Sequence, residues 1–318
     1  MQKRNMKKKK LNVLITCAGG SASLYYAKHL KKSYGIFLAD ASEKTIARFQ
    51  GFPFVQIPFG NDKRFFSVLD QLVKRWKIDV ILPGADEELI PVSQYCEKHP
   101  CVTGIIPRED FIKLCLNKTR LMQVLDKEKI SHLLPFKSVS QIRYPAIVKP
   151  VYGRGSKGVH RVTNASALRG YLALYGKRFS DVLVQPHIEG VEWTVSVIVN
   201  DQNQLIGIVP KRIIEKRGIT RVAVTEKNRV IEKLCKQLVE RFQPAGPFNV
   251  QLKMFKGVPY VFEINPRLST SSVLTDVAFG NELDLFVKAR GQKRLTRVPK
   301  MKTGVFLYRY EENVFIQP

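Results

Sequence analysis

Apolar stretches alternate with amphipathic ones along the first third of the chain. The pattern predicts buried strands over residues 11–16 and 36–39, with an amphipathic helix over 24–31 between them. A further helix is predicted over 64–74 and a further strand over 79–82. Strands and helices in alternation predict a small parallel sheet covered by helices.

A glycine-containing turn separates the first predicted strand from the first helix. The turn is Ala18-Gly19-Gly20-Ser21-Ala22-Ser23, and the second strand ends at Asp40. Strand, turn, helix, strand and acidic residue in this order are typical of a dinucleotide-binding fold. The turn lacks the second and third glycines of the G-x-G-x-x-G fingerprint, which a dehydrogenase would need intact.

Three acidic residues, Asp86-Glu87-Glu88, open another predicted helix after a turn at Pro83-Gly84. Carboxylates in the first turn of a helix are stabilised by the helix dipole, and we expect that role here. Contact with a substrate is the alternative.

The character of the sequence changes near Asn117. This residue is predicted to cap a helix whose buried face carries Leu121, Val124 and Leu125. Lys118 falls in the first turn of the helix, where a positive charge opposes the helix dipole. A lysine at this position therefore indicates a purpose other than helix stability.

A glycine-rich loop follows the strand predicted over 144–149. The loop, residues 150–158, contains three glycines, which let backbone amides close on phosphate oxygens. Lys149, Ser156 and Lys157 add side-chain donors. No Gly-Lys-Ser/Thr opens a helix here, so the loop is not of the Walker type.

A predicted β-hairpin carries several polar side chains in a regular pattern. Its strands cover residues 250–255 and 260–264 and are joined by a turn at Lys256-Gly257. In an antiparallel pair, Gln251 can lie opposite Glu263 or close to it.

Two further polar residues extend this hairpin. Asn265 lies two positions beyond Glu263 and therefore on the same face of its strand, and Arg267 follows. Magnesium takes hard oxygen ligands, usually one or two protein carboxylates together with substrate phosphates, and arginine can bind a phosphate through two nitrogens. Together with Gln251, these residues predict a metal–phosphate site. An ordinary hairpin with a solvated polar face is the alternative.

Composition places the chain among globular proteins of two or three domains. It has 318 residues, of which 44% are hydrophobic and 10% aromatic. No apolar run reaches the roughly 18 residues of a membrane span. The five cysteines show no paired spacing, which predicts reduced thiols and a cytoplasmic protein.

The net charge of +26 is unusually high for a globular protein of this length and bears on its partners. A basic tail covers residues 1–10, and Lys and Arg are dense over 211–217 and 288–302. Such a charge favours polyanions, acidic substrates or anionic surfaces as partners. A basic bias of the whole proteome would explain it equally well.

Asn249-Val-Gln251 followed by Glu263-Ile-Asn-Pro-Arg267 resembles the metal-binding signature of the ATP-grasp superfamily. Within it, the match is closest to the large subunit of carbamoyl-phosphate synthase and its stand-alone relatives. The resemblance covers about the whole chain and implies an α+β ATP-grasp fold preceded by an α/β, Rossmann-like pre-ATP-grasp domain. The implied division is a basic tail over 1–10, a pre-ATP-grasp domain over 11–112 and an ATP-grasp domain over 113–318, with a lid subdomain over about 137–188.

The resemblance also implies cofactors and residue roles. ATP and Mg²⁺ (or Mn²⁺) would be bound, with metal ligands Gln251, Glu263 and Asn265. Catalytic roles would fall on Arg267 and on Lys211 and Arg212 of a basic loop over 211–220. The implied nucleotide-binding residues are Lys118, Lys149, Gly153, Gly155, Ser156, Lys157, Gly158, Gln185, His187, Ile188 and Glu192.

Some of these roles are more specific. Backbone groups near Gln185 and His187 would read the adenine edge, and Glu192 would bind the ribose hydroxyls. His187 would pack against adenine, with a general base as the alternative. Thr220 stands where the bicarbonate-handling half of the synthase has a histidine, which argues against bicarbonate as substrate.

The function implied is an ATP-dependent carboxylate–amine ligase that forms an amide or peptide-like bond through an acyl phosphate and releases ADP. Its substrates would be a small-molecule carboxylate and an amine, possibly acidic, and the chain would be a monomer or homodimer without a membrane partner. The alternative is a basic protein that binds nucleic acid or another polyanion on a degenerate ATP-grasp scaffold. No aromatic-rich RNA-binding motif supports that alternative.

Overall fold

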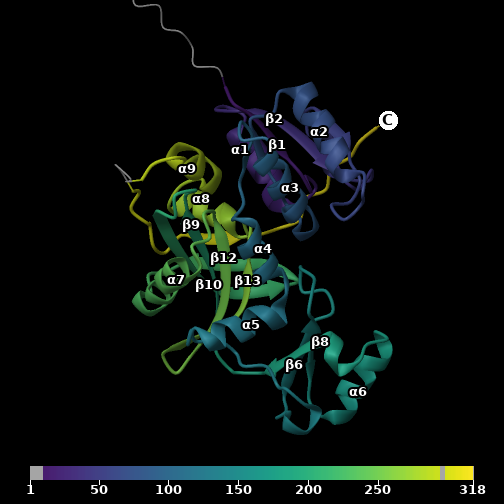
Figure 1. Cartoon of the computed structure of the whole chain (residues 1–318), viewed down its shortest axis with the longest axis vertical. Helices are drawn as coiled ribbons and strands as arrows, with labels where there is room; N and C mark the ends of the chain where they lie inside the picture. The colour runs from purple at the N-terminus through teal and green to yellow at the C-terminus, as the bar shows by residue number, and fades with distance from the viewer. Residues whose placement is uncertain (1–9, 294–297, 318) are drawn as a thin grey trace, which may run out of the picture. The chain divides into compact units, whose positions relative to one another are not determined.

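The computed structural model describes residues 10–293 and 298–317. Parts of the basic stretches predicted over 1–10 and 288–302 therefore lie outside the described residues. The chain divides into two compact units, the first reaching to Ile105 and including Ile316, the second covering Ile106–Phe315. Their helices and strands are labelled in Figure 1.

The first unit is built on a parallel five-stranded sheet in the order β3-β2-β1-β4-β5. This is the order of a dinucleotide-binding half, and it confirms the predicted α/β fold. The strands are β1 (Asn12–Ile15), β2 (Gly35–Asp40), β3 (Phe54–Gln56), β4 (Val80–Leu82) and β5 (Thr103–Gly104). The helices are α1 (Ser21–Leu30), α2 (Phe65–Trp76) and α3 (Asp86–Lys98), with a 3₁₀ turn η1 (Ile46–Phe49).

The glycine turn after β1 is filled by side chains of the protein itself. The backbone N–H of Gly19 donates to Asp40 Oδ2 over 2.8 Å. A Cβ atom added to Gly19 would lie 2.3 Å from Thr45 Oγ1. The donor that could face a pyrophosphate in a dinucleotide-binding protein is thus already paired here.

Glu88 at the start of α3 has the structural role expected of it. Its side chain is buried, and Oε2 accepts from the Thr16 hydroxyl at 2.6 Å and from the backbone N–H of Ala85 at 3.1 Å. The carboxylate thereby ties the helix start to the end of β1.

The second unit contains a six-stranded antiparallel sheet in the order β13-β12-β9-β10-β11-β14. Its strands are β9 (Val191–Val199), β10 (Leu205–Arg217), β11 (Ile219–Thr225), β12 (Phe248–Phe255), β13 (Val258–Asn265) and β14 (Phe306–Tyr308). The accompanying helices are α4 (Glu109–Leu116), α5 (Lys118–Lys127), α7 (Arg229–Phe242), α8 (Ser272–Ala278) and α9 (Glu282–Ala289).

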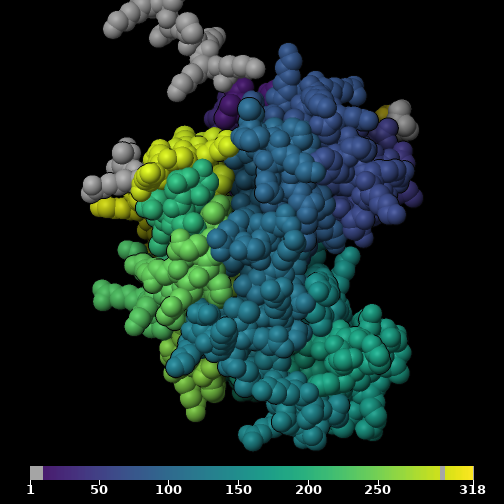
Figure 2. Space-filling model, viewed as in Figure 1, coloured from purple at the N-terminus to yellow at the C-terminus, as the bar shows by residue number. Residues whose placement is uncertain are grey.

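A smaller antiparallel sheet in the order β7-β6-β8 belongs to the same unit. Together with α6 it forms the teal lobe at the lower right of the space-filling view (Figure 2). Its elements are β6 (Ala146–Pro150), β7 (His160–Val162), α6 (Ala165–Leu174) and β8 (Val182–Pro186), with 3₁₀ turns η2 (Val139–Gln141) and η3 (Phe179–Asp181). Ala146, Val148 and Leu168 are buried in a core of its own.

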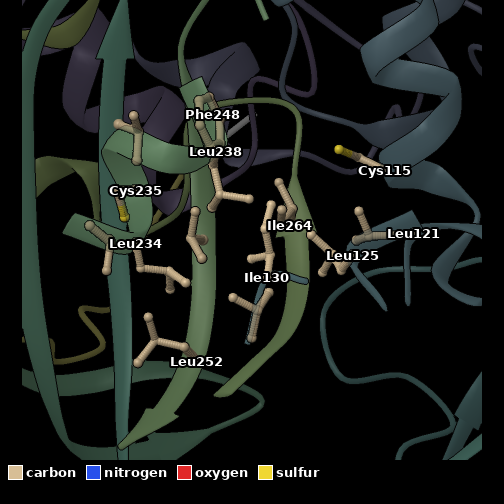
Figure 3. Packing of buried hydrophobic residues seen from close by; sticks show 14 of the residues in the cluster. Cys115, Leu121, Leu125, Ile130, Leu234, Cys235, Leu238, Phe248, Leu252 and Ile264 are labelled. Atoms are coloured by element: carbon tan, nitrogen blue, oxygen red, sulfur yellow. The ribbon is translucent and has the colours of Figure 1, made fainter. Parts of the chain in front are cut away.

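The main core of the second unit lies between helices and the large sheet. Figure 3 shows Leu238 of α7 and Leu125 of α5 packed with Leu252 and Ile264 of the β12–β13 hairpin. Burying an aliphatic side chain of this kind contributes roughly 1.5–3 kcal/mol. The hairpin that carries the predicted metal ligands is therefore fixed by hydrophobic packing.

Two local predictions need correction. The basic loop expected over 211–220 is a β-hairpin, because β10 continues to Arg217 and β11 begins at Ile219. On α5, Val124 is half-buried, while Met122 takes the predicted place of Val124 in the core.

None of the helices in the described ranges is long and apolar enough to cross a membrane. All five cysteines lie in those ranges and are free thiols.

Candidate active site

A cavity of about 290 Å³ lies within the second unit, between the small sheet and the large one. Most of the predicted site residues line it, from five separate parts of the chain. They are Lys118, Lys149, Gly153, Gly155, Ser156, Lys157, Gln185, His187, Ile188, Glu192, Gln251, Glu263, Asn265 and Arg267. Gly158, Lys211 and Arg212 are outside this lining.

The β12–β13 hairpin brings the predicted metal ligands together. Gln251 lies directly opposite Glu263, and Asn249 lies opposite Asn265, as the antiparallel pairing predicted. A register shift between Gln251 and Leu252 interrupts the ladder at this point. A bulge bends a strand and re-aims its side chains, and here it occurs beside the polar cluster.

The donor set of this cluster fits a magnesium ion that is shared with phosphates. Glu263 supplies a carboxylate, and Gln251 and Asn265 supply amide oxygens at the same cavity wall. The described residues hold no group of three or more His, Cys, Asp or Glu side chains that could bind a metal alone. A hard cation held here would complete its coordination with oxygen ligands from water or from substrate phosphates.

Lys149, at the end of β6, is a buried cation facing the cavity. Only 3% of its surface is exposed, and Nζ donates to the backbone carbonyl of Phe262 over 2.9 Å. Burial lowers the pKa of Lys149 to about 8, although the charge of Glu263 acts in the opposite direction. A buried ammonium with few counter-charges gains strongly from an anionic ligand.

Lys118 holds a similar position at the start of α5. Asn117 caps the helix as predicted, since its Oδ1 accepts from the backbone N–H of Arg120 at 3.0 Å. Lys118 Nζ donates to the carbonyl of Gly153 at 2.5 Å. The lysine thus connects the helix start to the glycine-rich loop.

The glycine-rich loop depends on backbone conformations that favour glycine. Gly153, Gly155 and Gly158 have φ values of 129°, 67° and 70°. A Cβ on Gly158 would also lie 2.9 Å from Pro150 Cγ. Ser156 Oγ donates to the carbonyl of Gly218 at 3.1 Å, which joins the loop to the tip of the β10–β11 hairpin.

The segment from Gln185 to Ile188 forms another wall. Gln185 is buried and donates through Nε2 to the Leu133 carbonyl at 2.6 Å. The backbone N–H of His187 donates to the Pro145 carbonyl at 3.2 Å, so in this structure that amide is paired. Burial, with the nearby charge of Lys253, lowers the pKa of His187 and favours a neutral ring suited to packing.

Charge in the cavity is strongly asymmetric. Seven lysine and arginine side chains line it, against the two glutamates Glu192 and Glu263. Glu192 Oε1 accepts from Lys216 Nζ at 2.5 Å. The cavity therefore suits a ligand with several negative charges.

Residues 115–271 match a family model described as an ATP-grasp domain. This part of the chain is similar to the ATP-grasp family. The match begins in α4 and ends beyond Arg267, so it includes every residue that lines the cavity.

Solved structures with the same fold extend the likeness beyond that domain. An N5-carboxyaminoimidazole synthetase from Staphylococcus aureus in complex with ADP is 20% identical, with a TM-score of 0.72 over 94% of this chain and 83% of that one. An L-amino acid ligase from Bacillus licheniformis is 18% identical, with a TM-score of 0.67 over 89% and 74%. A biotin carboxylase from Campylobacter jejuni is 15% identical, with a TM-score of 0.69 over 93% and 74%. The whole fold is thus an α+β ATP-grasp fold with a preceding α/β domain.

Lys211 is outside the cavity lining, although its register partner on β9, Thr194, lines the cavity. It is fully buried, and Nζ donates to Ser196 Oγ at 2.7 Å and to Thr275 Oγ1 at 2.9 Å. The Ser196 hydroxyl in turn donates to Glu282 Oε1 at 2.6 Å. Burial lowers the pKa of Lys211 to about 8 and raises that of Glu282.

Arg212 is also outside the cavity lining and pairs with a glutamate. Its Nε pairs with Glu226 Oε2 at 2.8 Å, with both side chains partly exposed. Lys211 and Arg212 are thus absent from the cavity lining that contains Arg267.

Sequence reasoning missed several residues of the cavity wall. Thr194 lies two positions beyond Glu192 on β9, and Asn249 lies two positions before Gln251 on β12. Because alternate residues of a strand share a face, period-two counting from Glu192 and Gln251 would have found both. Lys216 was hidden in the segment expected to be a loop.

Proposed function

We propose that the chain is an ATP-dependent carboxylate–amine ligase that forms an amide or peptide-like bond and releases ADP and phosphate. The observation that carries the proposal is the pairing of Gln251 with Glu263 in a cavity that also receives the buried Lys118 and Lys149. Oxygen ligands for a cation beside buried cations for phosphate are what Mg-ATP requires.

The residue roles follow from position. Glu263, Gln251 and Asn265 would hold magnesium, which neutralises charge on the β- and γ-phosphates when it is bound. Lys118 and Lys149, which both line the cavity, would contact phosphate oxygens. His187 and Ile188 would enclose adenine, and Glu192 would bind the ribose after exchanging its contact with Lys216.

The proposed chemistry proceeds in two displacements. A carboxylate oxygen attacks the γ-phosphorus, the bond to the β-phosphate oxygen breaks, and ADP leaves with an acyl phosphate formed. An amine nitrogen then attacks the acyl carbon, phosphate leaves, and the amine gives up a proton to solvent. Positioning and charge neutralisation supply most of the acceleration in such a scheme. Arg267, which lines the cavity, would offset charge on the transferred phosphoryl group.

We also propose a relation to the carbamoyl-phosphate synthase large subunit, on the strength of Asn249-Val-Gln251 and Glu263-Ile-Asn-Pro-Arg267. Thr220 lines the cavity at the position compared with the synthase histidine. This residue argues for a carboxylate other than bicarbonate.

A substrate screen tests the proposal. Purified protein with Mg-ATP is incubated with a panel of carboxylates, each with and without a panel of amines, and ADP release is measured. We expect ADP release that requires a particular carboxylate and an amide product that also requires an amine. Lys149→Ala should remove this turnover by weakening Mg-ATP binding, and equal ATP affinity in the folded variant would contradict its assignment. The ligase proposal would be overturned if the parent hydrolysed ATP without a carboxylate. It would also be overturned if no combination of carboxylate and amine caused ADP release.

A further inference from the structure

Side chains from neighbouring strands form the cavity floor in rows that run away from the proposed adenine pocket. In the first row Lys253 of β12 pairs with Glu192 of β9, and Lys253 Nζ donates to the Ile188 carbonyl at 2.9 Å. In the second row Gln251 lies between Thr194 and Glu263. The first row marks the adenine end, and the second marks the metal end.

A third row lies beyond the metal ligands. Asn249 of β12 is paired with Ser196 of β9 on one side and with Asn265 of β13 on the other. It is two residues, or about 6.8 Å, further from the adenine end than Gln251. A group bound at Asn249 would therefore lie past the terminal phosphate, where the second reactant must enter.

The amide of Asn249 is incompletely paired. Its Oδ1 accepts from the Thr194 hydroxyl at 2.8 Å, but within the described part of the chain Nδ2 has no hydrogen-bond partner. The residue is 1% exposed and lines the cavity. A buried donor left unpaired costs about as much free energy as a lost hydrogen bond, so an acceptor on a ligand is the expected partner.

The surroundings favour an anion as that acceptor. Ser269 and Ser271 also line the cavity and are buried, with their hydroxyl oxygens 2.9 Å apart. The two carboxylates among the described lining residues are Glu263, in the proposed metal set, and Glu192, paired with Lys216. Neither of these two is left to hold an ammonium group of a substrate, and the Glu282 carboxylate that accepts from Ser196 of the third row is buried beside Lys211.

We propose that Asn249 is a specificity-determining residue whose amide donates to the substrate carboxylate, and that this third row accepts an anionic carboxylate carrying no adjacent ammonium. The assignment rests on the proposed ligase function and names its substrate class. If the Asn249 side-chain amide were rotated by 180°, Oδ1 would face the cavity in place of Nδ2. The site would then select a hydrogen-bond donor such as an ammonium group.

Asn249→Asp separates these two possibilities because it keeps the shape and the Thr194 contact while replacing the donor by a negative charge. ADP release would be measured with matched carboxylates that differ by one α-amino group, such as glutarate and glutamate, succinate and aspartate, and longer homologues. Asn249→Ala provides a second variant in case the buried carboxylate prevents folding. Asn228→Asp is the control, because Asn228 caps α7 outside the cavity and aspartate caps a helix equally well.

For the parent, we expect higher kcat/KM with the forms that lack the amino group. Asn249→Asp should raise the KM for the preferred carboxylate by about 10²-fold or more, with Mg-ATP affinity changed much less. Asn249→Ala should raise it by about 10-fold or more. The control should match the parent.

Two results would overturn the assignment while leaving the ligase standing. One is an unchanged carboxylate KM in both variants, and the other is a preference for amino acids that Asn249→Asp improves. Mg-ATP binding without carboxylate-dependent ADP release in the parent would instead overturn the proposed function, and this assignment with it.

Discussion

Two buried lysines share a depressed pKa but occupy different environments. Lys149 faces the cavity, whereas Lys211 is enclosed by Ser196, Thr275 and the nearby charge of Glu282. Burial lowers both pKa values to about 8. The same physical cause thus acts on a lysine that faces a cavity and on one enclosed by hydrogen bonds, and only neighbours distant in sequence distinguish them.

Lys211→Met tests the structural role. Because the pKa of Lys211 is lower in the folded than in the unfolded chain, its charge opposes folding below about pH 8, and that opposition disappears as pH rises from about 8 towards 10.5. The free energy of unfolding of the parent should therefore rise across this window more steeply than that of the variant. The variant also leaves the buried Glu282 without its nearby counter-charge, which should cost about 3–5 kcal/mol near neutral pH.

Chemical denaturation at several pH values measures both effects, and Mg-ATP titration of the folded variant provides the functional readout. We expect ATP affinity within a few-fold of the parent. A folded Lys211→Met variant with parental stability and lost ATP binding would place Lys211 in the site after all.

At the scale of elements, the sequence pattern was sufficient where periodicity was regular. The hairpin of β12 and β13 follows from its alternation and the turn at Lys256-Gly257. The β10–β11 hairpin was missed because register shifts between Ile213, Glu215 and Lys216 break the alternation that marks a strand. A dense run of charges over the same residues then favoured a loop.

Gly158→Ala tests the glycine-rich loop as an element. Alanine at a left-handed φ costs roughly 1–2 kcal/mol, and here its Cβ would also meet Pro150. We expect a displaced loop and weaker Mg-ATP binding, measured by calorimetry, although Gly158 itself does not line the cavity.

Gly176→Ala is the matched control, since Gly176 has φ of 57° with no atom within 4 Å of an added Cβ. Gly176→Ala should lower the free energy of unfolding by the same backbone strain without affecting ATP binding. Equal ATP affinities for the parent and both variants would show that the conformation of the loop is unimportant for the nucleotide.

At the scale of the whole molecule, the family resemblance predicted the two-part fold, and most of the site residues that it implied line the cavity. It could not predict the contacts of Lys211, because they join residues 196, 211, 275 and 282 through tertiary packing. Nor could it predict that the Asn249 amide has a donor without a partner among the described residues, since that depends on which atoms surround the amide. Sequence patterns indicate which face of a strand a side chain occupies. Which side chains hydrogen-bond to one another depends on the packing of the folded core.

The charge of +26 also belongs to this scale. Binding of a short DNA duplex, used as a polyanion probe, should weaken by about 10³-fold between about 50 and 200 mM salt, as for contacts made mainly to phosphates. Carboxylate-dependent ADP release should be unaffected by the duplex. Salt-sensitive DNA binding without any ATP turnover would favour the polyanion-binding alternative, and flat salt dependence would favour a basic bias of the whole proteome.

The central claim is that the β12–β13 hairpin is a metal-dependent phosphoryl-transfer site, and Glu263→Gln tests it most directly. Glu263 is the one carboxylate of the proposed metal set, and glutamine keeps its shape while removing the charge. Glu226→Gln, which alters a carboxylate paired with Arg212 outside the cavity, is the control.

The decisive measurement is carboxylate-dependent ADP release by the parent and both variants, with melting temperatures recorded with and without Mg-ATP. The account predicts that Glu263→Gln loses roughly 10²–10³ in rate, gains little stability from Mg-ATP, and melts no lower than the parent without it, while Glu226→Gln keeps parental turnover. Parental turnover in a folded Glu263→Gln variant would contradict the account and move the active site away from this hairpin.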